Sequence, residues 1–241
     1  MNKKLTKIFF LKNFELSVNE KKVLNNDIIK MEWLSRLLPS NSNIPEFKDE
    51  NYFFEEVQFM ICTLDDNLLS VKSDICISIF QKYIPYQIIL IIEDNDGFII
   101  NTSDKRINLN DKSKRTIEKQ FTTPIIPKLY KNDITTSFFE SINFIKQDKL
   151  SLQSFYNGYI DLIIQYKSSL ITGTFQKKNR LRSEIDSNLL ETMNMMENEV
   201  SKLSNQIKKE LQINKKVSMN IEIQKLRKEL DLIKIKLMAN E

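Results

Sequence analysis

The chain has 241 residues, 41% of them apolar and 28% charged, and its formal net charge is only +4. It contains no histidine, which excludes histidine-based acid–base catalysis, Ser–His and Cys–His nucleophile pairs, and histidine-ligated metal sites. With three glycines and five prolines, the composition argues against Gly-rich loops and a disordered Pro/Gly linker. The apolar runs are too short to cross a bilayer, so we expect a folded cytoplasmic protein.

The first third of the chain predicts two short elements, a loop and a strand. A helix is expected over 18–25 and a strand over 27–38, with Trp33 buried. A loop is expected over 39–51, because this segment is polar and contains two prolines, which disfavour a regular helix or strand. The segment 52–66 alternates from residue 56 onward, which predicts a strand whose second face is also partly covered.

The next segments predict a helix and then a hairpin. Residues 67–85 have apolar side chains at helical spacing, with Asn67 as a candidate N-cap and Pro85 as the terminator. Two β-rich runs within 86–103 flank Asp96-Gly97, a typical hairpin turn. Nearby carboxylates could suggest a metal, but turn chemistry explains Asp96 without one. Alternation predicts a further strand over 115–127.

Helical periodicity begins near residue 137, and a long helix is expected over 150–173, ended by Gly173. Its broad face is aromatic and apolar, which indicates core packing more than a base-stacking surface. That face consists of Leu152, Phe155, Tyr156, Tyr159, Leu162, Ile163 and Tyr166.

Two heptad-like apolar rows occupy the C-terminal part. The first row is Leu189, Met193, Met196, Val200, Leu203 and Ile207, and the second is Met219, Ile223, Leu226, Leu230, Ile233 and Leu237. The second row is two residues out of phase with the first, a shift that neither a stutter nor a stammer produces. We therefore predict two helices with an interruption at about 212–219, capped by Asn214, Ser218 or Asn220. A self-folded antiparallel hairpin, a symmetric dimer and a heteromeric coiled coil would each cover these rows.

The predicted fold class is α+β, with an antiparallel sheet core and flanking helices followed by a C-terminal helical hairpin or coiled coil. The predicted domains are a core over 1–173 and an extension over 174–241. Cys62 and Cys76 are too few for a four-ligand zinc site and are expected to be small buried residues. No cofactor is expected.

Basic residues form three runs, at 103–106, 111–115 and 177–182. Such runs are most often solvated surface and otherwise contact phosphates. The candidate nucleic-acid contacts are in the third run: Lys177, Lys178, Arg180 and Arg182.

Four segments, "DIIKMEWLSRLLPSNSNI", "EEVQFMICTL", "IPYQIILII" and "KKELQINKKVSMNIEIQKLRKEL", resemble the bacterial domain-of-unknown-function family 4391 in order and spacing across nearly the whole chain. The resemblance implies gene neighbourhoods with restriction-type helicases and DNA methyltransferases, and hence a role in defence against phage or foreign DNA. The family supplies no active-site residues to carry over.

The sequence is compatible with three functions. The first is a non-enzymatic accessory subunit that docks a helicase, nuclease or methyltransferase, with the second apolar row (Met219 to Leu237) as its interface. The second is a divergent metal-dependent nuclease, with Asp27, Glu55, Glu56 and Gln58 as candidate ligands and Lys30 nearby. The third is a stand-alone nucleic-acid binder. No G-x-x-x-x-G-K-[ST] motif is present, so ATP use would belong to a partner.

Overall fold

The computed structural model describes residues 3–111 and 114–239, and the chain forms two compact units, residues 1–163 and 164–241. Helix α6 (Leu152–Thr172) runs through the boundary between them. The domain boundary predicted from the sequence, between residues 173 and 174, falls just after the end of this helix and stays a prediction. The class predicted from the sequence is confirmed: an α+β core and a C-terminal helical pair.

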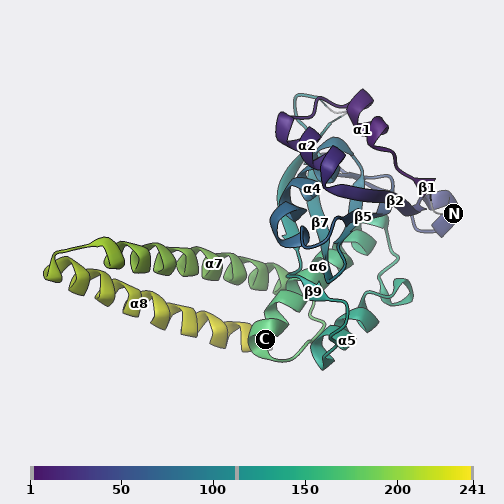
Figure 1. Cartoon of the computed structure of the whole chain (residues 1–241). Coiled ribbons are helices and arrows are strands. Elements are labelled where there is room, and N and C mark those ends of the chain that lie inside the picture. The colour runs from purple at the N-terminus through teal and green to yellow at the C-terminus, as the bar shows by residue number, and fades with distance from the viewer. Residues whose placement is uncertain (1–2, 112–113, 240–241) are drawn as a thin grey trace. The chain divides into compact units, whose positions relative to one another are not determined.

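The first unit contains a sheet (Figure 1). Its described strands run in the order β1-β2-β5-β6-β7-β8, with β9 paired to β7. A separate two-stranded ribbon pairs β3 with β4. The strands are β1 Lys3–Lys4, β2 Ile28–Leu37, β3 Phe47–Lys48, β4 Phe53–Phe54, β5 Val57–Leu64, β6 Gln87–Glu93, β7 Gly97–Ile107, β8 Arg115–Thr122 and β9 Ile126–Pro127.

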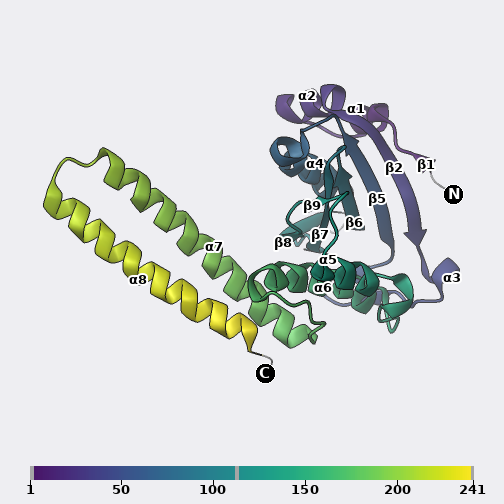
Figure 2. The same ribbon diagram turned by 60° about the horizontal axis from the view of Figure 1, so that its bottom comes forward.

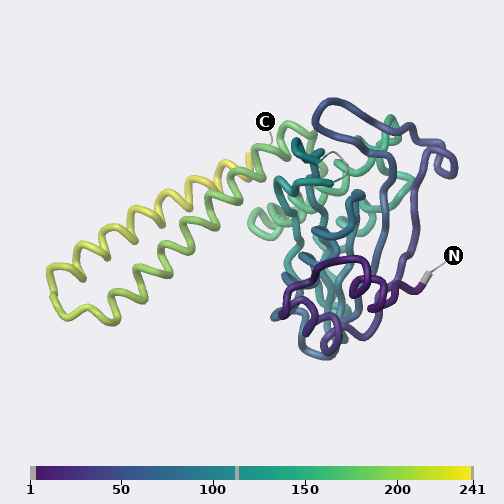
Figure 3. The backbone as a smooth tube through the Cα atoms, turned by 90° about the horizontal axis from the view of Figure 1, so that it is seen from above, coloured from purple at the N-terminus to yellow at the C-terminus, as the bar shows by residue number. Residues whose placement is uncertain are grey.

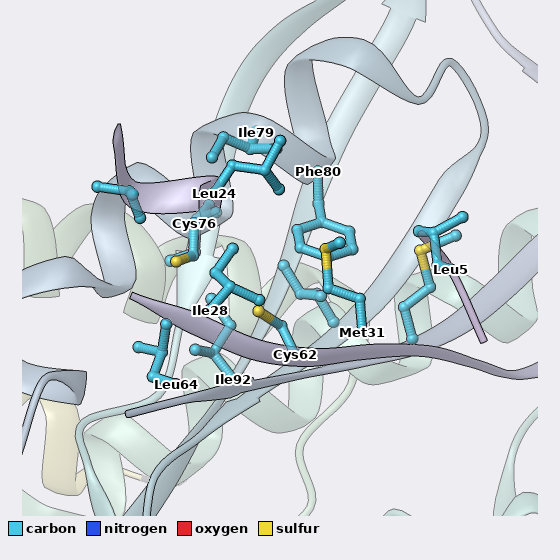
Figure 4. Close-up of a cluster of buried hydrophobic side chains, with 14 of the residues drawn as sticks. Leu5, Leu24, Ile28, Met31, Cys62, Leu64, Cys76, Ile79, Phe80 and Ile92 are labelled. Atoms are coloured by element: carbon cyan, nitrogen blue, oxygen red, sulfur yellow. The ribbon is translucent and has the colours of Figure 1, made fainter. Parts of the chain in front are cut away.

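Helices cover both faces of this sheet (Figure 2). The helices of the first unit are α1 Lys7–Asn13, α2 Val18–Asn26, α3 Pro39–Ser42, α4 Leu69–Tyr83, α5 Asp133–Ser141 and the first part of α6. One core cluster lies between α1, α2 and α4 and the sheet, and it includes Phe10. Leu24, Met31 and Phe80 belong to the same cluster (Figure 4). Cys62 and Cys76 are free and buried in this cluster, as expected from the sequence.

The sheet is mixed, which corrects the expectation of an antiparallel core. Strands β5 and β6 are parallel neighbours, with Val57 opposite Gln87, and α4 is the crossover between them. A parallel pair needs such a crossover, and strands covered on both faces read as continuous apolar runs. The run Ile88–Ile92 is of this kind, since four of its five side chains are buried. All other strand pairs described are antiparallel.

The start of α4 differs from its predicted form. Asn67 is not the N-cap, because its φ is +61° and the helix begins two residues later with Leu68 as its cap residue. Leu68 has no side-chain oxygen, and the Asp94 carboxylate accepts a hydrogen bond from the Leu69 amide at 3.1 Å instead. A residue 25 positions away therefore caps the first turn.

The hairpin between β6 and β7 is confirmed, but its turn depends on Asp94 more than on Asp96. The Asp94 Oδ1 accepts hydrogen bonds from the amides of Asp96 (3.0 Å) and Gly97 (3.1 Å). A side chain at Gly97 would meet Ile125 Cγ2 at 2.8 Å, so glycine is needed where β9 approaches. Turn hydrogen bonds thus account for a carboxylate here, as expected, but the carboxylate that accepts them is Asp94 and not Asp96.

Other local expectations need smaller corrections. Trp33 is only partly buried against the core, although its Nε1 is shielded and has no hydrogen-bond partner among the described residues. The loop 39–51 contains the short elements α3 and β3, and the strand expected over 115–127 is divided into β8 and β9.

The aromatic face of α6 packs inside the protein, as predicted. Its first half belongs to the first unit, where Tyr156 is fully buried. The Tyr156 hydroxyl accepts a hydrogen bond from the Ser103 amide at 2.9 Å and lies within hydrogen-bond distance of the carbonyl oxygens of Ile88 and Ser103. Gly173, with φ of +83°, follows the last turn of the helix.

The second unit consists of the end of α6 and two long antiparallel helices, α7 (Arg180–Lys209) and α8 (Ile213–Met238), which form a hairpin (Figure 3). The predicted break is confirmed but lies earlier, at residues 210–212. None of the three expected capping residues is used, because Gln212 is the cap residue and has no side-chain cap. The Glu210 carboxylate instead accepts hydrogen bonds from the amides of Leu211 and Gln212.

Candidate functional site in the C-terminal hairpin

The second apolar row packs against α7 of the same chain. Ile223, Leu230, Ile233 and Leu237 are buried, whereas Met219 and Leu226 are half-buried. Their partners on α7 include Met193, Leu189 and Met196, all members of the predicted first row. Of the three arrangements open from the sequence, the structure shows the antiparallel hairpin. Any partner that engages this row would have to compete with α7.

Helix α8 also has a second apolar row, on the side opposite the first. Its members are 52% to 75% exposed, and they are Ile213, Val217, Ile221, Leu232, Ile235 and Met238. At 100° per residue they centre about half a turn away from the row that contacts α7. We call this set the outer row. Exposed apolar side chains on one face of a helix are typical of an interaction site, and here Gln224, Lys225 and Lys228 separate the row into two parts between Ile221 and Leu232.

The third basic run, at the start of α7, forms an ion network around one buried carboxylate. Asp186 has no exposed side-chain surface, and its oxygens lie 2.8 Å from Lys178 Nζ and 2.9 Å from Arg182 Nε. The two cations also donate to carbonyl oxygens at the end of α8, Lys178 to Leu237 and Arg182 to Lys236. This end of a helix attracts cations because of its dipole.

The four predicted nucleic-acid contacts therefore fall into two kinds. Lys178 and Arg182 are only 14% and 13% exposed and hold α7 to the end of α8. Lys177 is exposed, and Arg180 forms a surface ion pair with Glu184 at 3.0 Å. Phosphate contact by this run stays a prediction, and the geometry favours Lys177 and Arg180 as its accessible members.

A polar pocket of about 240 Å³ borders this network within the second unit. It is lined by Gln165, Ser168, Ser169, Thr172, Thr174, Gln176, Lys178, Leu237 and Met238. Gln165 Nε2 donates to Ser183 Oγ at 2.9 Å and to the Lys178 carbonyl at 3.0 Å, which connects α6 to the start of α7. Gln165 Oε1 and Ser168 Oγ are buried without a partner among the described residues.

The other two basic runs lie in the first unit. Lys105 is fully buried and donates to the carbonyl oxygens of Ile84 and Tyr86, each at 2.8 Å. Burial, followed by the charge of Arg115, lowers the Lys105 pKa well below its usual value. Arg106 forms an ion pair with Glu118. In the run 111–115, Lys112 and Ser113 lie outside the described residues. The basic run 103–106 therefore contains one residue of the protein core, Lys105.

Of the four candidate nuclease ligands, only Glu56 and Gln58 come together. Glu56 is buried and pairs with Arg36, and it also accepts a hydrogen bond from Gln58. Asp27 lies beside Lys72 at 3.6 Å, at the other end of the β2–β5 pair, because Ile28 is opposite Leu64 and Leu37 is opposite Val57.

The two remaining candidates are paired elsewhere. Glu55 lies 4.0 Å from Arg115, and Lys30 lies 2.7 Å from Glu32. Across the part of the chain that the structure describes, no three His, Cys, Asp or Glu residues are grouped to hold a metal ion.

Together these features define an α+β domain with a C-terminal two-helix hairpin. The profile of the family described as "Domain of unknown function (DUF4391)" matches residues 1–230, so the chain belongs to this family. A search of curated proteins and a search of solved structures each found no match. Among the described residues, no helix combines the length and apolar character needed for a membrane span.

Two features of the hairpin were not predicted from the sequence. The outer row was hidden because α8 is apolar on two opposite faces, so a single-face pattern search finds only the stricter row. Asp186 was missed because one acid within a charged helix ordinarily indicates solvent exposure. Its spacing of four residues from Arg182 was the available signal.

Proposed function

We propose that this protein is a non-enzymatic accessory subunit of a bacterial anti-phage or restriction-type defence complex. Its C-terminal hairpin docks a protein partner, such as a helicase, nuclease or methyltransferase. The observation that carries the proposal is the two-faced character of α8. One apolar row is covered by α7, and the outer row is exposed along the same helix.

The distribution of charged groups supports a docking role over catalysis. The carboxylates of the nuclease alternative are paired with cations or separated along the strands. The chain also lacks histidine and a phosphate-binding loop motif. Nucleic-acid contact through Lys177 and Arg180 is a secondary part of the proposal, because the remaining cations of that run are engaged with Asp186.

The defence setting of the proposal rests on the family resemblance. The resemblance implies that genes of such proteins are often found near restriction-type helicases and DNA methyltransferases, and this neighbourhood supports a shared function. An accessory subunit without its own ATP-binding motif would depend on such a partner for energy.

Co-expression with the products of the flanking genes tests the proposal. The full chain should elute with one of them in size-exclusion chromatography, with a mass by light scattering that equals a defined complex. Cells carrying the gene set should resist phage, and deletion of this gene should abolish resistance. A chain that stays monomeric beside every neighbour, or that alone cleaves plasmid with Mg²⁺, would contradict the accessory role.

A further inference from the structure

The net charge of the chain is concentrated on one helix. Helix α8 contains seven Lys or Arg residues and three Asp or Glu residues, so its net charge of +4 equals that of all 241 residues. The remainder of the sequence is neutral overall. Charge of one sign beside an apolar surface selects partners by electrostatic complementarity.

The outer row and these cations lie together. A groove of about 420 Å³ on α8 is lined by Val217, Asn220, Ile221, Gln224, Lys225 and Lys228. Lys225 and Lys228 have no acidic partner within ion-pair distance among the described residues. The groove therefore combines the apolar side chains of Val217 and Ile221 with two lysines that form no ion pair among the described residues.

We propose that the outer row of α8 binds an amphipathic helix with acidic flanks from the partner protein. The proposal deepens the function proposed above and rests on it. A helix laid along α8 would insert apolar side chains at i, i+3, i+4 and i+7 spacing against Val217, Ile221 and Ile235. Its Glu or Asp residues would face Lys225 and Lys228.

Charge argues against a second copy of the chain as the occupant. Self-association through the outer row would bring two helices of net charge +4 within a distance at which salt screens charges only partly. Duplex DNA is disfavoured for a different reason. Phosphate contact needs several cations gathered on one surface, whereas Lys225 and Lys228 stand between the exposed apolar side chains of the outer row.

Fluorescence anisotropy with designed peptides tests the proposal on the full chain. One labelled 22-residue helix carries leucine at its a and d positions and glutamate at the flanking positions, and a second has each glutamate replaced by lysine. The glutamate peptide should bind, and the lysine peptide should bind at least about tenfold more weakly. No binding of the glutamate peptide, or equal binding of both, would overturn the proposal.

Two sets of variants locate the binding surface. Ile221→Glu with Ile235→Glu should weaken glutamate-peptide binding by about tenfold or more. Met195→Glu makes the same change at an exposed position of α7 and should leave binding unchanged. Circular dichroism checks that each variant is folded. Lys225→Glu with Lys228→Glu should reverse the preference toward the lysine peptide, a result that unfolding could not produce.

Two further probes separate this surface from other anionic targets. Phosphatidylglycerol vesicles and a 20-base-pair duplex should not compete with the glutamate peptide. If either competes and its binding is lost with Ile221→Glu, the outer row is a lipid or DNA surface and the proposal fails. If no peptide binds but the complex with a gene neighbour still forms, only the docking surface is wrong. If the peptide binds and no complex forms, the accessory function is wrong and the surface stands.

Discussion

Lys178 and Asp186 are joined by an ion pair of 2.8 Å in which the carboxylate has no exposed surface. Arg182 shares the same carboxylate, and both cations reach the last carbonyl groups of α8. Two charges that sequence patterns assign to a basic surface thus connect the start of α7 to the end of α8. Breaking such a network leaves buried charges without partners.

Asp186→Asn should therefore destabilise the hairpin by about 3–5 kcal/mol, the usual cost of removing one member of a buried ion pair. Urea denaturation followed by circular dichroism at 222 nm measures the change. Glu184→Gln removes a carboxylate from the exposed pair with Arg180 and should cost less than about 1 kcal/mol. Equal effects of the two changes would show that the buried network contributes little.

The exposed and the buried cations of the basic run 177–182 should have different effects on DNA binding and on stability. Lys177→Ser with Arg180→Ser should leave the fold intact and lower the slope of log K against log salt by up to about 0.9 per lost duplex-phosphate contact. Lys178→Ser with Arg182→Ser should mainly reduce stability. Titrations at several salt concentrations, with thermal unfolding alongside, distinguish the two effects. An unchanged slope in the first variant returns this run to ordinary solvated surface.

Leu230 and Leu232 lie two residues apart on opposite sides of α8 and should respond differently to truncation. Leu230 is packed among α7 side chains, so Leu230→Ala should cost about 2–5 kcal/mol of hairpin stability. Leu232 belongs to the outer row, and Leu232→Ala should change stability by less than about 0.5 kcal/mol. Urea midpoints of the two variants give the comparison. Similar losses would mean that both faces of α8 are covered in solution.

The buried Lys105 should make stability depend on pH in the alkaline range. Its pKa is lowered in the folded chain by burial and then by Arg115, whereas in the unfolded chain it is near 10.5. Between those two values the unfolded chain binds one more proton, so stability rises as pH rises toward about 10.5 and is lost as pH falls.

Lys105→Met removes the titrating amine. It should therefore lower the slope of the free energy of unfolding against pH by up to about 1.4 kcal/mol per pH unit. Chemical denaturation between pH 8 and 10.5 measures both profiles. If the variant keeps the slope of the unmodified chain, another group causes it.

A chain truncated after Gly173 should retain a folded core. It keeps α6 whole, including Tyr156 and its hydrogen bonds to Ser103, and it loses only the hairpin. Its circular dichroism should show mixed helix and strand, with a cooperative thermal transition. A disordered spectrum would mean that α7 and α8 complete the core and that the predicted boundary between residues 173 and 174 is wrong.

The local pattern of side chains was sufficient to predict most elements. Alternation predicted β5 and β8, β-forming residues predicted β2 and the β6–β7 hairpin, and helical spacing predicted α4 and α6. The phase shift between two apolar rows was enough to predict two C-terminal helices, because a continuous helix cannot keep both rows on one side. The absence of histidine limited the chemistry before any fold was known.

Only the tertiary structure decided which distant groups meet. Asp94 caps α4 from the turn between β6 and β7, β5 and β6 pair in parallel, and Asp186 lies buried between two cations. Lys105 looks like a surface residue in sequence and is completely buried in the fold. Periodicity reports one helix or strand at a time, whereas pairing, capping and desolvation depend on residues brought together from far along the chain.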